Sequence, residues 1–190
     1  MAGNRPVDVG PIWLSAQLPS YHEPDPYQVL VYQKGAYILE MLRTLMWDGK
    51  QKNPDAPFIN LMRDFVATHS GKNASTEDFQ RIVEKHMGQP MDWFFDEWVY
   101  GTEIPRYALK YDLKDAGGGK TQASFSVTQS GVSDSFVMKV PVYIVVSGQP
   151  RRLGLMNITG SNTVRADVVL QLRPEKVELD SEKSILCIVQ

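Results

Sequence analysis

The sequence predicts an α+β protein in which a helical segment is followed by a small antiparallel β-sandwich. Two observations indicate this class. Before Pro105, apolar residues recur at the three- and four-residue spacing of helices, whereas after it they alternate with polar residues as in strands. The length of 190 residues allows two small domains, and we expect them at residues 1–104 and 105–190.

The first domain begins with a lead-in, residues 1 to about 26, that is rich in proline. Its five prolines disfavour regular helix, so we expect a lid or connector here. Residues 32–100 then predict four helices. The first is amphipathic, with Ile38, Leu42 and Leu45 on one side and Gln33, Tyr37, Glu40 and Thr44 on the other.

The other three helices carry start and stop signals. The second opens at Asp55, with Pro57 in its first turn. The third begins at Ser75, which forms an approximate capping box with Asp78, and Gly88 fits its end. The fourth covers 91–100 and places Phe94 and Trp98 one turn apart. The four helices therefore form one helical half of the molecule.

The second domain predicts about seven short strands. Residues 123–128 alternate between apolar and polar side chains, which gives one buried and one exposed face. Residues 139–144 are expected to do the same, with Lys139 and Tyr143 on the exposed side. Further strands are expected at 106–113, 152–158, 164–172, 177–179 and 185–189, with turns at 117–119 and 160–162. This spacing is typical of a sandwich of immunoglobulin-like size.

Composition excludes several classes of partner. The formal net charge of −2 comes from 20 basic and 22 acidic residues that are mixed along the chain, so we expect no nucleic-acid partner. No apolar stretch approaches the roughly 18 residues of a membrane span, so we expect a soluble protein without a transmembrane segment. No signal peptide is evident at the start, and the compartment stays open between cytoplasmic and exported.

Metal and nucleophile motifs are absent from the sequence. No two of His22, His69 and His86 are spaced to share a helix face, and the prolines that follow His22 favour a loop there. Cys187 is the only cysteine, which excludes an internal disulfide, and its apolar strand should raise its pKa and blunt its reactivity. We therefore expect this chain to bind no metal and no other cofactor by itself.

One segment is unusual: Tyr32-Gln33-Lys34-Gly35-Ala36, at the start of the first helix. A glycine in the first turns of a helix costs about 1 kcal/mol relative to alanine, which indicates close packing or a backbone constraint. From the residues alone, a structural explanation is favoured over a functional one.

These five residues resemble the Tyr-x-Lys-Gly-Ala helix of the alanyl aminopeptidase and leukotriene hydrolase family of zinc metallopeptidases, which are gluzincins. Three further segments, 58–65, 75–79 and 94–105, resemble the elements that follow in that family. The resemblance covers the chain from about residue 10 to the end. It implies the C-terminal half of a metallopeptidase catalytic domain, followed by the family's small β domain.

The resemblance also implies roles for residues. Tyr32 would stabilise the tetrahedral intermediate, whereas Lys34 and Gly35 would be structural. The family's zinc ligands, its His-Glu-x-x-His helix and its exopeptidase glutamate are expected upstream, so the parent enzyme would bind zinc and this chain alone would be inactive. Of a fragment, a shortened homologue and a truncated gene product, we favour a fragment.

The implied partners are a peptide substrate, the upstream catalytic segment, and a second copy that contacts an exposed helical face. The alternative is a non-catalytic scaffold that binds peptides or proteins.

Overall fold

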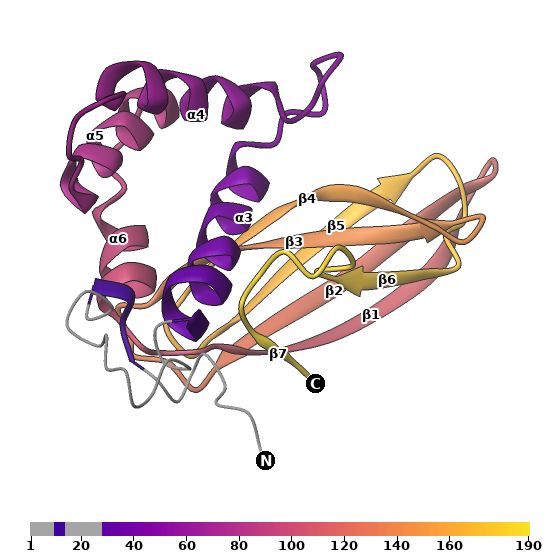
Figure 1. Ribbon diagram of the computed structural model, residues 1–190. Helices are drawn as coiled ribbons and strands as arrows, with labels where there is room; N and C mark the ends of the chain where they lie inside the picture. The colour runs from indigo at the N-terminus through magenta and orange to yellow at the C-terminus, as the bar shows by residue number, and fades with distance from the viewer. Residues whose placement is uncertain (1–9, 14–27) are drawn as a thin grey trace. The chain divides into compact units, whose positions relative to one another are not determined.

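The computed structural model describes residues 10–13 and 28–190 (Figure 1). The chain divides into two compact units between Thr102 and Glu103, one helical and one made of strands, which gives the expected α+β class. No helix in the described part of the chain is long and apolar enough to cross a membrane. Most of the proline-rich lead-in, including His22, lies outside the described residues.

From residue 28 on, the described part of the helical unit begins with a π-helical turn rather than a regular helix. This turn, η2, covers Gln28–Lys34 and continues into α3, Gly35–Met46. It is followed by α4 (Ala56–His69), α5 (Thr76–Met87), α6 (Asp92–Phe95) and a second π-helical turn, η3 (Asp96–Tyr100). The four predicted helices are therefore present, and the first and fourth each contain a π-helical segment.

Aromatic and aliphatic side chains hold these helices together. The Phe65 ring of α4 meets Phe79 of α5 edge-on at 5.0 Å, and Phe79 meets Phe95 of α6 at 6.3 Å. Fully buried side chains come from every helix and π-helical turn that the structure describes in this unit and from the residue before α6: Leu30, Met41, Leu42, Leu61, Val83, Met91, Phe94 and Trp98. Burial of each such side chain contributes about 1.5–3 kcal/mol, which makes this cluster the core of the unit.

The predicted helix ends are confirmed by their geometry. The Asp78 amide donates to the Ser75 hydroxyl at 3.2 Å, and the Ser75 amide donates to the Asp78 carboxylate at 2.8 Å, so α5 has a complete capping box. Gly88 ends α5 in the left-handed conformation, with φ of 67°.

Two expectations for the first helix are wrong. The sequence places Thr44 on the exposed side, but it is buried, because the buried residues of α3 (Ile38, Met41, Leu42, Thr44 and Met46) are not confined to one stripe. Gly35 predicts close packing or a backbone constraint at the start of this helix. A Cβ atom added there would meet only the Leu30 carbonyl oxygen, at an ordinary 3.9 Å, among the described atoms.

The strand unit contains two sheets, whose strands are labelled in Figure 1. The first sheet has the order β5-β2-β1-β7, and the second has the order β4-β3-β6. The strands are β1 (Arg106–Gly117), β2 (Lys120–Ser130), β3 (Val137–Val146), β4 (Gln149–Thr159), β5 (Thr163–Leu170), β6 (Lys176–Leu179) and β7 (Ile188–Val189). Buried apolar side chains come from both sheets.

The alternation predicted for β2 is confirmed, because Ala123, Phe125 and Val127 are buried while the serines between them are partly exposed. The glycines at 117–119 all have positive φ, between 61° and 80°, and turn β1 into β2. Local sequence thus encodes both the strand faces and the hairpin.

Two features of the strand unit differ from expectation. Tyr143 is buried instead of exposed, since β3 is the central strand of its sheet and is covered on both faces. The last strand is short, and it pairs with β1 in the parallel direction, so the unit is not purely antiparallel. Cys187 precedes this strand rather than lying within it.

Candidate active site

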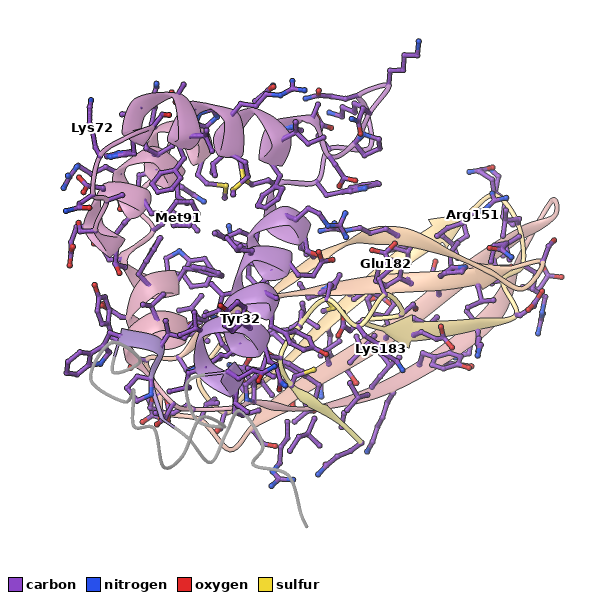
Figure 2. All side chains as sticks on the ribbon, viewed as in Figure 1. Tyr32, Lys72, Met91, Arg151, Glu182 and Lys183 are labelled. Atoms are coloured by element: carbon purple, nitrogen blue, oxygen red, sulfur yellow. The ribbon has the colours of Figure 1, made fainter. Side chains whose placement is uncertain are left out.

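Tyr32, the single predicted catalytic residue, lies on the surface of the helical unit (Figure 2). It belongs to η2, where Val29, Leu30 and Lys34 are buried, and its own side chain is 64% exposed. Because residues two positions apart lie on nearly opposite sides of a helical turn, burial of Leu30 and Lys34 directs Tyr32 outward. Tyr32 is therefore accessible to a ligand.

Tyr32 lines an open groove of about 530 Å³ in the helical unit. The groove is formed by the described residues Ile12, Val31, Tyr32, Gly35, Ala36, Ile38, Leu39, Ala74, Ser75, Thr76, Phe79, Phe95 and Val99. None of these side chains is charged, and the side-chain hydroxyls come from Tyr32, Ser75 and Thr76. The groove thus offers apolar walls and a few hydrogen-bonding groups, the combination common to small-molecule and peptide sites.

Lys34 is buried in the helical unit. It is only 2% exposed, and its ammonium donates to the Gly101 carbonyl at 3.1 Å and to the Gly10 carbonyl at 3.4 Å. Burial lowers the pKa of Lys34 to about 8, because removal from water disfavours the charged form. The structural role expected for Lys34 agrees with these contacts.

The residues described do not fit a zinc site. Within 10–13 and 28–190, no group of three or more histidine, cysteine, aspartate or glutamate side chains is arranged to hold a metal ion. The His86 Nε2 atom lies 2.9 Å from the Asp64 carboxylate, and the His69 ring packs at 5.1 Å from the Phe65 ring. Neither histidine lines the groove of Tyr32.

Cys187 is not an activated nucleophile. Burial raises the pKa of its thiol to about 12, and the nearby Asp180 carboxylate adds to this rise. A thiol with a raised pKa holds little thiolate at neutral pH. The expected inertness of Cys187 is thus supported, although it comes from a bend rather than from an apolar strand.

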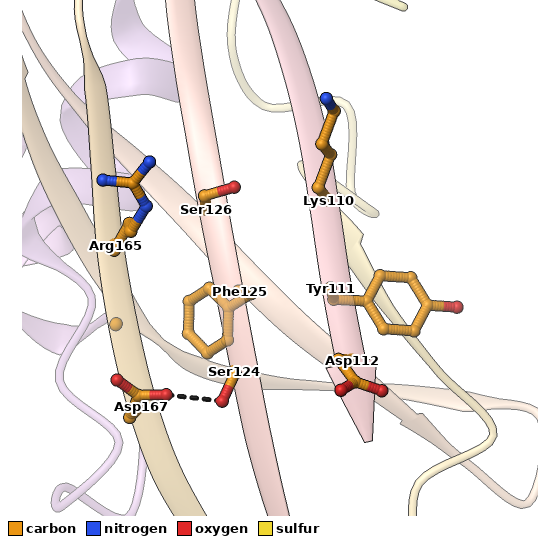
Figure 3. Close-up of a pocket in the computed structure, with 9 residues that line it drawn as sticks. Lys110, Tyr111, Asp112, Ser124, Phe125, Ser126, Arg165 and Asp167 are labelled. Atoms are coloured by element: carbon orange, nitrogen blue, oxygen red, sulfur yellow. Dashed lines mark hydrogen bonds between the residues drawn. The ribbon is translucent and has the colours of Figure 1, made fainter. Parts of the chain in front are cut away.

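A second depression, of about 330 Å³, lies on β1, β2 and β5 of the strand unit (Figure 3). Two neighbouring rows of side chains cross these strands, Lys110–Ser126–Arg165 and Asp112–Ser124–Asp167. The Ser124 hydroxyl donates to the Asp167 carboxylate. No histidine lines this depression, so Ser124 and Ser126 have no histidine beside them to act as a general base.

A third depression, of about 450 Å³, lies along α4 and is lined by Phe58, Ile59, Met62, Arg63, Val66 and Ala67. It is almost wholly apolar, and Val66 is 61% exposed. We refer to these six residues as the α4 face. It contains no titratable group other than Arg63, so it has the character of a contact surface rather than of a reaction site.

Sequence reasoning identified Tyr32 but not the rest of the groove. Phe79 was expected only as a buried helix residue and Ser75 only as a helix start, whereas Phe95 and Val99 were given no individual role. Their distance in sequence from Tyr32 gives no local signal that they share a groove. The burial of Lys34 could not be predicted from the sequence either, because lysine is rarely buried.

Comparisons with known proteins agree with the sequence resemblance. Residues 13–98, which include Tyr32, match the Peptidase family M1 domain. A search of curated proteins found no match. The crystal structure of aminopeptidase A from Legionella pneumophila, in complex with aspartic acid, resembles the chain with a TM-score of 0.64 and 17% sequence identity.

This likeness covers 87% of the present chain but only 18% of the Legionella chain, and at this identity it shows the fold. The family match and the shared fold together confirm the resemblance that the sequence indicated. Residues 13–98 are therefore similar to the Peptidase family M1 domain, and the chain has a fold like that of part of the Legionella aminopeptidase.

Proposed function

We propose that this chain is the tyrosine-bearing part of a zinc-dependent aminopeptidase, in which Tyr32 stabilises the oxyanion that forms during hydrolysis of an N-terminal peptide bond. The observation that carries the proposal is the placement of Tyr32. Its side chain is exposed on a groove within the segment that matches the M1 domain.

The chemistry of the phenol fits this role. A tyrosine hydroxyl is protonated at neutral pH and can donate a hydrogen bond to the oxygen on which negative charge develops. The walls of the groove are apolar, and a hydrogen bond is stronger where the local dielectric is low. Removal of one such donor typically costs about a hundredfold or more in rate.

The proposed enzyme requires a zinc ion, but the described residues of this chain do not fit a metal site. We assign its ligands to the catalytic segment that the family resemblance places upstream, and we derive no step from this chain that passes through the metal. The coding sequence upstream of Met1 provides the first test. It should encode a His-Glu-x-x-His helix, and a catalytic region without that motif would contradict the proposal.

The second test is catalytic. In an enzyme assembled from that upstream segment and residues 1–190, Tyr32→Phe should lower kcat/KM for an aminoacyl anilide by about a hundredfold. Tyr37→Phe is the matched control, because Tyr37 is also a partly exposed tyrosine but does not line the groove. Equal activity of the Tyr32→Phe and Tyr37→Phe enzymes would refute the role of Tyr32.

The second candidate function is a non-catalytic scaffold that binds peptides. It is favoured by the same groove, which is open and apolar and has no metal-ligating cluster among the described residues. Fluorescence anisotropy of labelled peptides with the isolated chain separates the two functions. Tight binding without zinc supports the scaffold, whereas binding that requires the upstream segment supports the enzyme.

The α4 face is the surface on which we place the contact of a second copy of the chain. It is the exposed apolar helical face that the dimer would require. Analytical ultracentrifugation of the chain and of a Val66→Glu variant tests this assignment. A monomer at all concentrations would exclude the dimer.

A further inference from the structure

Lys34 is an unusual residue for a protein interior. Lysine is almost never fully buried without an ionic partner, because transfer of an ammonium group out of water costs several kcal/mol. Lys34 is 2% exposed, yet both of its hydrogen-bond partners are main-chain carbonyls rather than carboxylates. Because burial of the Lys34 ammonium costs free energy, we expect Lys34 to have a role that compensates for this cost.

The two carbonyls join three separate segments of the helical unit. Gly10 belongs to the segment 10–13, Gly101 follows the last turn of η3, and Lys34 itself ends η2. The carbonyl groups at a helix end carry partial negative charge and lack partners within the helix, so an ammonium group is a suitable ligand for them. Lys34 thus ties the start of α3 to the end of η3.

The Gly101 anchor is itself rigidly placed. A Cβ atom at this position would lie 2.5 Å from the Glu97 carbonyl oxygen and 2.9 Å from the Asp96 carbonyl oxygen. The chain at Gly101 therefore follows the end of η3 more closely than any residue with a side chain could. Its carbonyl presents a fixed acceptor to Lys34.

Tyr32 and Lys34 lie two positions apart in the same π-helical turn and face opposite ways, one to the groove and one to the interior. π-helical turns are rare and are often found at functional sites. A contact that fixes the inward side chain of such a turn also fixes its rotation about the helix axis. The direction of the outward side chain is thereby set.

We propose that Lys34 is the positioning residue of Tyr32: by binding the Gly101 and Gly10 carbonyls, it holds η2 in the rotation that presents the phenol to the groove. The catalytic consequence rests on the proposed function of Tyr32. The coupling between the two side chains does not, and it is measurable in the isolated chain.

The charge of Lys34 provides a direct way to measure this coupling. Because burial lowers its pKa to about 8, the ammonium loses its charge and one of its three protons within an accessible pH range. Charge-assisted hydrogen bonds are about twice as strong as neutral ones, so deprotonation loosens the contact. Segment 10–13 carries no titratable side chain; η3 carries Asp96, Glu97 and Tyr100, none of which is bonded to Lys34.

The test is NMR spectroscopy of the isolated chain, with the Tyr32 ring resonances assigned from a Tyr32→Phe spectrum. In the unmodified chain these resonances should shift between pH 6.5 and 9 with a midpoint near 8, together with the Cε resonance of Lys34. In Lys34→Met, the midpoint near 8 should disappear and the ring resonances should take a new position at pH 7.

Lys72→Met is the matched control. The Lys72 ammonium also donates to a main-chain carbonyl, that of Thr68 at 3.2 Å, but it is exposed and lies far from Tyr32 (Figure 2). Its removal should leave the Tyr32 titration unchanged. The proposal is overturned if Lys34 titrates near pH 8 while the Tyr32 ring does not respond, or if the response survives in folded Lys34→Met.

If Lys34→Met does not fold, the joint titration in the unmodified chain still decides the matter. The outcome is also independent of the proposed activity. A coupled Tyr32 in an enzyme unaffected by Tyr32→Phe would refute the catalytic role alone, whereas an uncoupled Tyr32 that is essential for hydrolysis would refute only the role of Lys34.

Discussion

The same substitution, glycine to alanine, should have opposite effects on stability at the two ends of the Lys34 contact. Gly35 follows Lys34 directly, and Gly101 supplies its carbonyl acceptor. At Gly35 a Cβ atom has an ordinary 3.9 Å contact, whereas at Gly101 it would lie 2.5 Å from a backbone oxygen. Neither glycine has a positive φ, so the expected difference in stability comes from the space around the added Cβ atom rather than from backbone conformation.

The expected magnitudes follow from these distances. Alanine is more favourable than glycine inside a helix by about 1 kcal/mol, so Gly35→Ala should stabilise the helical unit by roughly that amount. At Gly101 the atoms in the way belong to the backbone of η3, which cannot move cheaply, and overpacking of this kind costs about 1–3 kcal/mol. The two variants should therefore differ by about 2–4 kcal/mol.

Urea unfolding followed by circular dichroism at 222 nm measures this difference, because the helices of the chain lie in the helical unit. A loss of more than 1 kcal/mol in Gly35→Ala would refute the reasoning, since it would mean that Gly35 is closely packed after all. Unchanged stability in Gly101→Ala would refute it at the other end.

Three further outcomes are expected. Ser75→Ala removes the hydroxyl that accepts the hydrogen bond of the Asp78 amide in the capping box. It should lower the free energy of unfolding by about 1 kcal/mol, seen as a lower Tm, and an unchanged Tm would contradict this. Cys187 in the folded chain should react with iodoacetamide at pH 8.5 far more slowly than in the unfolded chain, and rapid labelling of the folded chain would contradict its burial. Because the pKa of the folded-state thiol, about 12, exceeds the ordinary 9.0, the contribution of Cys187 to stability is complete below pH 9 and declines toward pH 12. The isolated chain with added zinc should not hydrolyse an aminoacyl anilide, and measurable turnover by pure material would contradict the assignment of the metal ligands to another segment.

Local signals in the sequence predicted the features that depend on neighbouring residues. Ser75 and Asp78 are three positions apart, and their reciprocal hydrogen bonds need nothing else from the fold. The glycines at 117–119 likewise define their hairpin through backbone conformation alone. The motif around Tyr32 is also local, and together with the segments 58–65, 75–79 and 94–105 it indicated the family.

Features that depend on distant residues were not predicted. Thr44 and Tyr143 are polar enough to indicate an exposed face, but each lies on an element that is covered on more than one side. Lys34 is buried because Gly101, 67 positions away, supplies an acceptor for its ammonium. A periodicity of 3.6 residues also cannot reveal a π-helical turn, whose hydrogen bonds span five residues instead of four.

The parallel pairing of β7 with β1 brings the two ends of the strand unit together. The Ile188 amide donates to the Pro105 carbonyl at 3.0 Å, and the Gln190 amide donates to the Tyr107 carbonyl at 2.8 Å. A domain whose entry and exit are adjacent can be inserted into a longer polypeptide, or circularly permuted, with little disturbance to its surroundings. The strand unit therefore has the geometry of a transferable module, which a short linker between Gln190 and Glu103 would close into a ring.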